Sequence, residues 1–164
     1  MESQYVPEVA VIIAVMKWLH FEGWTVECLS IPSGQKIDSI ASKNQVKAQL
    51  ALLGIEARNV RFASGGEDIR ASKDNIPWKI ECKGLGGEER RQTVKNQFDR
   101  ALASAVSYYN QDQGLRVGIA LPEEYMKHIE GRLPKALRAA LNLWVFLYIS
   151  ADDVLLAFAP DEKI

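Results

Sequence analysis

The chain has 164 residues, of which 48% are apolar and 25% are charged, and its formal net charge is −1. This composition is typical of a soluble globular protein, and the length suffices for one packed domain over residues 1–164 but not for two. A net charge near zero excludes a general electrostatic attraction to nucleic acid or to anionic membranes, although it is compatible with a local basic patch.

Cysteine usage and the amino terminus both favour a cytoplasmic protein. The two cysteines, Cys28 and Cys82, lie far apart in the chain and lack the spacing of a zinc site. The first eight residues lack the positive charge of a signal peptide. The apolar run 9–16 is shorter than the roughly 20 residues that a membrane span needs. We therefore expect reduced thiols, a cytoplasmic location and no membrane association.

Apolar periodicity and turn residues divide the chain into alternating helices and strands. The predicted helices are 7–23, 38–53, 92–110 and 123–142, the last of which is interrupted near Gly131 and restarts at Pro134. The predicted strands are 24–31, 76–83, 115–122, 143–149 and 154–159. Residues 57–64 and 67–72 are compatible with one bent strand or with two, because Gly65 and Gly66 separate them. This order predicts an α/β domain.

The predicted strand "IPWKIECK" (76–83) places charged side chains on one of its faces. Successive side chains of a strand point to opposite faces. The residues on the face suited to a core are Trp78, Ile80 and Cys82. Those on the opposite face are Lys79, Glu81 and Lys83. A strand that is apolar on one face and charged on the other suggests a site on the charged face.

Asp68, at the start of the segment "DIRAS", is a potential partner for Glu81. If this segment pairs with strand 76–83 through the turn "SKDN", both carboxylates reach the same end of the sheet. Two nearby carboxylates suit Mg²⁺, which prefers hard oxygen ligands and a substrate phosphate, and Lys83 would hold water or phosphate beside the metal. The acid-x-Lys triplet alone has little weight, because a second one occupies 161–163 and composition predicts about as many by chance.

The stretch "GGEDIRASKDNIPWKIECKG", with a preceding helix that contains Glu8 and a following helix that contains Gln97, resembles the PD-(D/E)xK nuclease superfamily. The resemblance extends in element order over residues 7–150. It implies a restriction-endonuclease-like fold of three α/β/α layers with a central mixed sheet. It also implies a metal-dependent deoxyribonuclease that uses Mg²⁺, with Mn²⁺ as a substitute, to hydrolyse phosphodiester bonds of DNA.

The resemblance assigns roles to individual residues. The implied catalytic residues are Asp68, Glu81, Lys83 and Gln97, and the implied metal ligands are Asp68, Glu81 and Glu8. Two positions depart from common patterns of the superfamily. Glu67 precedes Asp68 where proline is frequent, which the superfamily tolerates, and Ala101 rather than tyrosine follows Gln97 by four residues. The second departure argues against the RecB-like subgroup.

Other interpretations of the same residues remain open. Asp38 is a rival for the role of Asp68. Glu8 equally suits the positive end of a helix dipole in the first helical turn. Glu81 and Lys83 are also compatible with a solvated cross-strand ion pair.

Three cations after the charged strand, Arg90, Arg91 and Lys95, are expected to contact DNA phosphates, although such residues are also common in a solvated helix start. The glycine-rich segment 84–87 favours a second function, nucleotide binding, but it lacks the full G-x-G-x-x-G pattern and a Walker lysine. A third alternative is a catalytically inactive nuclease-fold subunit that binds DNA. Cleavage of both strands of a duplex by so short a chain would most simply require a homodimer.

Overall fold

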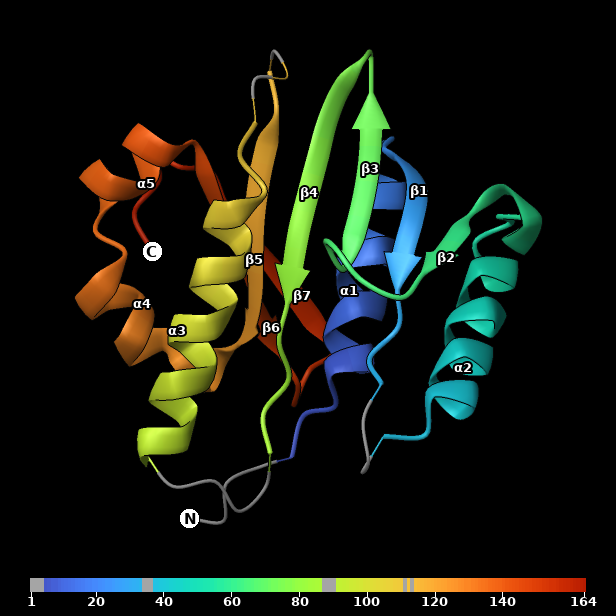
Figure 1. Cartoon of the computed structure of the whole chain (residues 1–164), viewed down its shortest axis with the longest axis horizontal. Helices are drawn as coiled ribbons and strands as arrows, with labels where there is room; N and C mark the ends of the chain where they lie inside the picture. The colour runs from blue at the N-terminus through green and yellow to red at the C-terminus, as the bar shows by residue number, and fades with distance from the viewer. Residues whose placement is uncertain (1–4, 34–36, 87–90, 111, 113) are drawn as a thin grey trace.

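The computed structural model describes residues 5–33, 37–86, 91–110, 112 and 114–164. Within these residues it contains five α-helices, two short 3₁₀ helices and one seven-stranded sheet (Figure 1). The α-helices are α1 (Glu8–Phe21), α2 (Ser39–Leu52), α3 (Arg91–Ser107), α4 (Met126–Arg132) and α5 (Lys135–Leu141). The strands are β1 (Thr25–Ser30), β2 (Arg61–Ala63), β3 (Ile69–Lys73), β4 (Ile76–Cys82), β5 (Arg116–Pro122), β6 (Leu143–Ile149) and β7 (Val154–Phe158). The 3₁₀ helices are η1 (Ala57–Asn59) and η2 (Glu123–Tyr125).

The sheet is mixed, with the strand order β2-β1-β3-β4-β5-β6-β7. The pairs β1–β2, β4–β5 and β5–β6 are parallel, and the pairs β1–β3, β3–β4 and β6–β7 are antiparallel. The hairpin predicted between "DIRAS" and "WKIECK" is present as β3–β4. Its two turn residues, Asp74 and Asn75, have φ values of 51° and 64°. Positive φ at both positions is the geometry of a type I′ turn, which matches the twist of the flanking strands.

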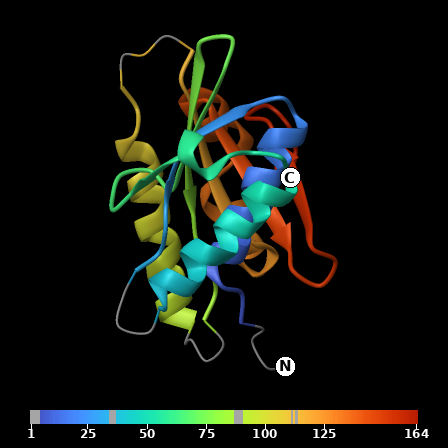
Figure 2. The same cartoon turned by 90° about the vertical axis from the view of Figure 1, so that its right-hand side faces the viewer.

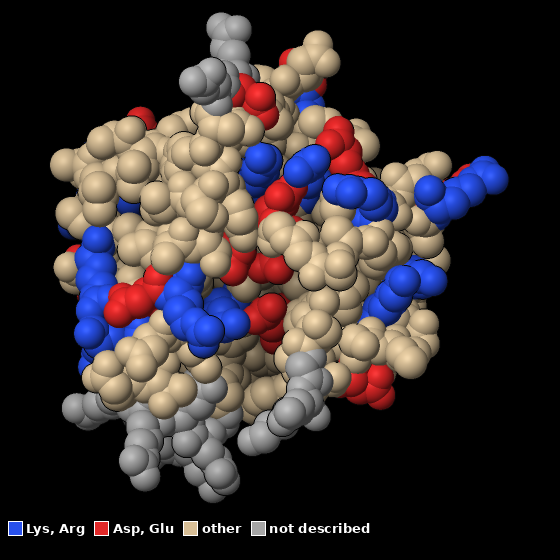
Figure 3. All heavy atoms as spheres, viewed as in Figure 1, with Lys and Arg blue, Asp and Glu red and all other residues tan. Residues whose placement is uncertain are grey.

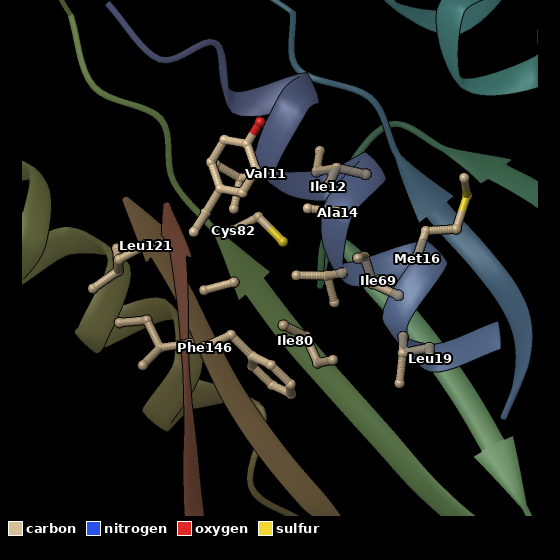
Figure 4. Close-up of a cluster of buried hydrophobic side chains, with 14 of the residues drawn as sticks. Val11, Ile12, Ala14, Met16, Leu19, Ile69, Ile80, Cys82, Leu121 and Phe146 are labelled. Atoms are coloured by element: carbon tan, nitrogen blue, oxygen red, sulfur yellow. The ribbon is translucent and has the colours of Figure 1, made fainter. Parts of the chain in front are cut away.

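Helices α1 and α3 lie on opposite sides of the sheet (Figure 2). The face toward α1 is the main hydrophobic core, where Ile80 and Cys82 of β4 point toward apolar side chains of α1 (Figure 4). Trp78, from the same face of β4, is fully buried. The charged residues of β4 face the α3 side and are only partly buried. The predicted separation of β4 into an apolar and a charged face is therefore confirmed.

The α/β class predicted from the sequence is confirmed, and the open question about residues 57–72 is resolved. Segments 57–64 and 67–72 form two separate strands, β2 and β3, which lie on either side of β1. The helix predicted over 92–110 begins at Arg91 and ends at Ser107. None of the helices in the described part of the chain combines the length and apolar character that a membrane crossing requires.

Candidate functional site

Asp68 lies immediately before β3, beside the carboxyl end of β4. Its Oδ2 accepts a 2.7 Å hydrogen bond from the main-chain N–H of Cys82. Its main-chain carbonyl accepts a 2.8 Å hydrogen bond from the N–H of Ser30, at the end of β1. Continuing the β3–β4 register by one pair sets Asp68 opposite Glu81, and cross-strand partners share a face of the sheet. The structure therefore brings the two carboxylates to the same end and the same face of the sheet.

Glu81 is held by a side chain that follows α3. The hydroxyl of Tyr108 donates a hydrogen bond to Oε2 of Glu81 and also lies 3.3 Å from the carbonyl oxygen of Gly66. Burial raises the pKa of the Tyr108 hydroxyl, and the bond to Glu81 raises it further, so the hydroxyl stays protonated and remains a donor. Ser104, one turn earlier on α3, also hydrogen-bonds to Glu81. Helix α3 therefore fixes the orientation of the Glu81 carboxylate.

Lys83 and Glu8 meet at the edge of the same site. Lys83 directly follows β4, and its Nζ lies 3.1 Å from Oε2 of Glu8 in the first turn of α1. An antiparallel bridge between Val6 and Leu85 holds the two segments side by side. Glu8 thus acts here as the ion-pair partner of Lys83 rather than only as an acid at a helix amino terminus.

The three acids Glu8, Asp68 and Glu81, called the acid cluster below, influence one another electrostatically. Burial, followed by the Glu81 and Glu8 carboxylates, raises the pKa of Asp68 to about 8, although the Cys82 N–H and Lys83 oppose the shift. Burial also raises the pKa of Glu81, against the opposing effect of its bond from Tyr108. Lys83 therefore offsets only part of the unfavourable free energy of ionising these carboxylates.

The three residues of the acid cluster are partly exposed. Figure 3 shows acidic atoms in a hollow near the centre of the face that includes the carboxyl end of β4, with lysine and arginine side chains beside it. Lys83 is 34% exposed and Glu8 is 20% exposed, so a ligand from solvent has access to both.

Gln97 is connected to the backbone beside this site by hydrogen bonds through a tyrosine. Its Oε1 accepts a 2.8 Å hydrogen bond from the hydroxyl of Tyr125, which also lies 3.1 Å from the carbonyl oxygen of Gly84. Gln97 is therefore linked to the backbone next to Lys83 through one tyrosine.

Tyr108 and Tyr125 are the site residues that sequence reasoning missed. Tyr108 shares a helical face with Gln97, and that spacing was the available signal. Tyr125 belongs to η2, after β5, and no sequence pattern connects it with Gln97.

Asp38, the rival for the role of Asp68, has a local structural role. It is exposed, and its Oδ1 accepts a 2.9 Å hydrogen bond from the N–H of Ala41 as the N-cap of α2. The geometry thus favours Asp68 over Asp38 as the partner of Glu81.

Close backbone packing explains the first glycine of the glycine-rich segment, Gly84. A Cβ at Gly84 would lie 2.5 Å from both the N atom of Glu8 and the carbonyl oxygen of Val6. Only glycine permits this approach of two backbones, and the need for it does not involve a phosphate. Gly87, at the end of the segment, lies outside the described residues.

Of the three predicted phosphate contacts, Lys95 is the one whose side chain belongs to the described part of the chain. Arg90 lies outside the described residues, and Arg91 begins α3 with a side chain that is also outside them. Lys95 is 43% exposed, and its Nζ lies 4.0 Å from Asp99 one turn later. Lys95 is therefore a weakly paired surface cation on the first turns of α3.

The carboxylate oxygens of the acid cluster suit one hard cation whose remaining coordination positions are filled by other ligands. Across the described residues, no group of three or more His, Cys, Asp or Glu side chains is arranged to hold a metal ion by itself. Mg²⁺ commonly uses only one or two protein carboxylates together with water and substrate phosphate. Comparisons of the chain with protein-family models, curated proteins and solved structures found no match.

Proposed function

We propose that this chain is a Mg²⁺-dependent deoxyribonuclease with a restriction-endonuclease-like fold. The observation that supports this proposal most directly is the placement of Asp68 and Glu81 at one end and on one face of the sheet, next to Lys83. The raised pKa values of Asp68 and Glu81 mean that ionising both carboxylates is unfavourable with only Lys83 beside them, and a bound divalent cation would stabilise the ionised forms.

The proposed roles follow from the position of each side chain. Asp68 and Glu81 would bind Mg²⁺ through their carboxylates, with Glu8 near enough to contribute. When bound, Mg²⁺ supplies Lewis-acid stabilisation of the charge that develops on a phosphodiester. Lys83 would orient a phosphate oxygen or the attacking water through its Nζ, and Glu8 holds that ammonium group in place.

Further residues would orient this core. Tyr108 keeps the Glu81 carboxylate in a fixed orientation, and Gln97 borders the site through Tyr125. Lys95, together with Arg90 and Arg91, is proposed to contact DNA phosphates, which position the duplex without reading its sequence. A symmetric homodimer is proposed for cleavage of both strands, since one chain offers one site.

The test is a nuclease assay with Mg²⁺ or Mn²⁺ on linear duplex, single-stranded and branched DNA. Asp68→Asn keeps an oxygen acceptor for the Cys82 N–H but removes the charge, and Lys83→Met removes the ammonium group. Each should lower the cleavage rate by roughly three orders of magnitude, which corresponds to about 4 kcal/mol of transition-state stabilisation.

Asp38→Asn is the matched control, because asparagine is also a good N-cap and should leave cleavage unchanged. Cleavage that survives both Asp68→Asn and Lys83→Met would refute the assigned site. DNA binding without cleavage by the wild type in either metal would instead favour the inactive DNA-binding subunit.

A further inference from the structure

The four tryptophans of the chain gather at the end of the sheet opposite to the acid cluster. Strands β1, β4 and β6 run in the same direction, and a tryptophan lies just before β1 and within the first three residues of β4 and of β6. These three residues, Trp24, Trp78 and Trp144, are called the tryptophan cage. The ring centroids of Trp24 and Trp144 lie 4.8 Å and 5.0 Å from that of the buried Trp78. Trp18, from α1, lies 5.8 Å from Trp78 on the same side.

Arg116, the first residue of β5, lies inside the tryptophan cage. Its Cζ is 5.2 Å, 5.3 Å and 5.1 Å from the ring centroids of Trp24, Trp78 and Trp144. All three distances are within the range of cation–π interactions. In the described part of the chain, no hydrogen bond and no ion pair involves the Arg116 guanidinium. The indoles therefore hold a guanidinium whose five N–H donors are available to an anion.

A pocket of about 420 Å³ opens beside the tryptophan cage. Its walls include Trp18, Trp24, Trp144, Ile76, Arg116 and Lys73. The Nζ of Lys73 lies 6.0 Å from the ring centroid of Trp24 and donates a 2.9 Å hydrogen bond to the carbonyl oxygen of Glu22. The pocket thus combines flat aromatic walls with two cations, and its volume is within the range of small-molecule sites.

We propose that this pocket binds a nucleotide, with its base against the indoles that line the pocket and its phosphate at Arg116 and Lys73. Aromatic side chains stack on bases of any sequence, and a neighbouring cation adds attraction for the backbone phosphate. Glu22 and Asp74 also line the pocket. Their carboxylates repel a bare phosphate ion but accept hydrogen bonds from base amino groups and sugar hydroxyls, so they favour a whole nucleotide.

This site differs from the glycine-rich segment, whose described residues 84–86 follow the other end of β4, and it does not require the proposed nuclease activity. The nucleotide has two potential sources, a free mononucleotide or one unit of a single-stranded nucleic acid. Both present the same base and phosphate to the pocket, and an experiment distinguishes them.

The experiment follows the indole N–H signals in ¹H–¹⁵N spectra of the full chain in EDTA. The titrants are deoxyadenosine 5′-monophosphate, deoxyadenosine, inorganic phosphate and a short oligodeoxyadenylate. We expect saturable shifts of the Trp24 and Trp144 signals with the nucleotide, at a dissociation constant below about 1 mM. Arg116→Met should weaken binding at least about 10-fold, whereas Lys135→Met, which removes an exposed cation on α5, should leave it unchanged.

A second variant protects the test against a folding defect in Arg116→Met. Lys73 is exposed at the rim of the pocket, so Lys73→Met should fold normally and also weaken binding. Binding of the oligonucleotide but not of the mononucleotide would identify a strand as the source. The proposal is overturned if neither the mononucleotide nor the oligonucleotide gives saturable shifts, or if inorganic phosphate binds as tightly as the mononucleotide. It is also overturned if Lys73→Met and folded Arg116→Met both bind the nucleotide like wild type. Asp68→Asn should retain binding, which separates this proposal from the nuclease proposal.

Discussion

The main-chain N–H of Cys82 donates a 2.7 Å hydrogen bond to Oδ2 of Asp68, so a side-chain carboxylate rather than a main-chain carbonyl of β3 is the acceptor at this end of the hairpin. The bond ties the carboxylate of one strand to the backbone of the next. It therefore fixes Asp68 close to Glu81 while it also satisfies the N–H of a residue that is 1% exposed.

Asp68→Ala and Asp68→Asn should differ in stability because only one of them keeps this acceptor. Alanine leaves the N–H of Cys82 without its partner, and an unsatisfied buried donor costs about 1–3 kcal/mol. Asparagine retains a side-chain oxygen at the same position. Urea denaturation at pH 6 without metal should show a lower free energy of unfolding for Asp68→Ala than for Asp68→Asn. Equal stabilities would show that the bond to Cys82 contributes little.

The stability of the metal-free protein should fall as the pH rises from about 4 to about 8. The pKa of Asp68 is about 8 in the folded protein against an ordinary value of 3.8, so the folded chain binds more protons than the unfolded chain between these values. Unfolding then releases a proton, and the contribution of protonated Asp68 is complete below pH 3.8 and lost as the pH rises through 8. One such proton gives a slope of up to about 1.4 kcal/mol per pH unit.

Thermal and urea denaturation of wild type and Asp68→Asn in EDTA measure this slope. Asp68→Asn has no carboxyl at this position, so its stability should change less with pH over the same interval. Mg²⁺ should stabilise the wild type more at pH 8 than at pH 5, because metal binding requires the ionised carboxylate. Parallel pH profiles for the two proteins would show that the pKa of Asp68 in the folded protein is close to its ordinary value.

Tyr108→Phe should weaken Mg²⁺ or Mn²⁺ binding by about 10–100-fold, the usual effect of losing a residue that orients a metal ligand. The substitution removes only the hydroxyl that donates to Glu81. Titration calorimetry with each metal measures the effect, which depends on the proposed metal site.

Tyr109→Phe is a matched control from the adjacent position. The Tyr109 hydroxyl is buried and has no hydrogen-bond partner among the described residues. Its removal should leave metal affinity unchanged and should not lower the free energy of unfolding, because no bond is lost. Equal metal affinities for Tyr108→Phe and wild type would contradict the orienting role of Tyr108.

Local sequence patterns were sufficient to predict the part of the site that belongs to one hairpin. Alternation assigned Glu81 to the charged face of β4, and the turn residues Asp74 and Asn75 indicated the pairing that brings Asp68 opposite to it. The order of helices and strands also predicted the α/β class, since each element has its own periodicity. The position of β2 beside β1 was not predictable, because strand neighbours are set by long-range packing.

Contacts between distant segments could not be predicted from local sequence patterns. Tyr125 reaches Gln97 across 28 positions of the sequence, and the bond depends on how η2 packs beside α3. The enclosure of Arg116 by the tryptophan cage likewise depends on the common direction of strands that are far apart in the chain. Periodicity contains no information on such pairings, so only the tertiary structure reveals them.

Gly84→Ala should destabilise the protein and displace the segment that contains Glu8. The new Cβ would lie 2.5 Å from the backbone N of Glu8 and from the carbonyl oxygen of Val6, and neither atom belongs to a flexible side chain. Relief of this clash requires the bridge between Val6 and Leu85 to open. Overpacking of this kind costs about 1–3 kcal/mol, and the ion pair between Glu8 and Lys83 should weaken with it.

Gly131→Ala is the matched control, because Gly131 lies in α4 and a Cβ there meets nothing within 4 Å. Alanine in a helix is favoured over glycine by about 0.5–1 kcal/mol, so this variant should be slightly more stable than wild type. Chemical denaturation compares the two variants, and the side-chain NMR signal of Lys83 reports on its ion pair. A Gly84→Ala protein as stable as Gly131→Ala, with an unchanged Lys83 signal, would show that close backbone approach does not require glycine at this position.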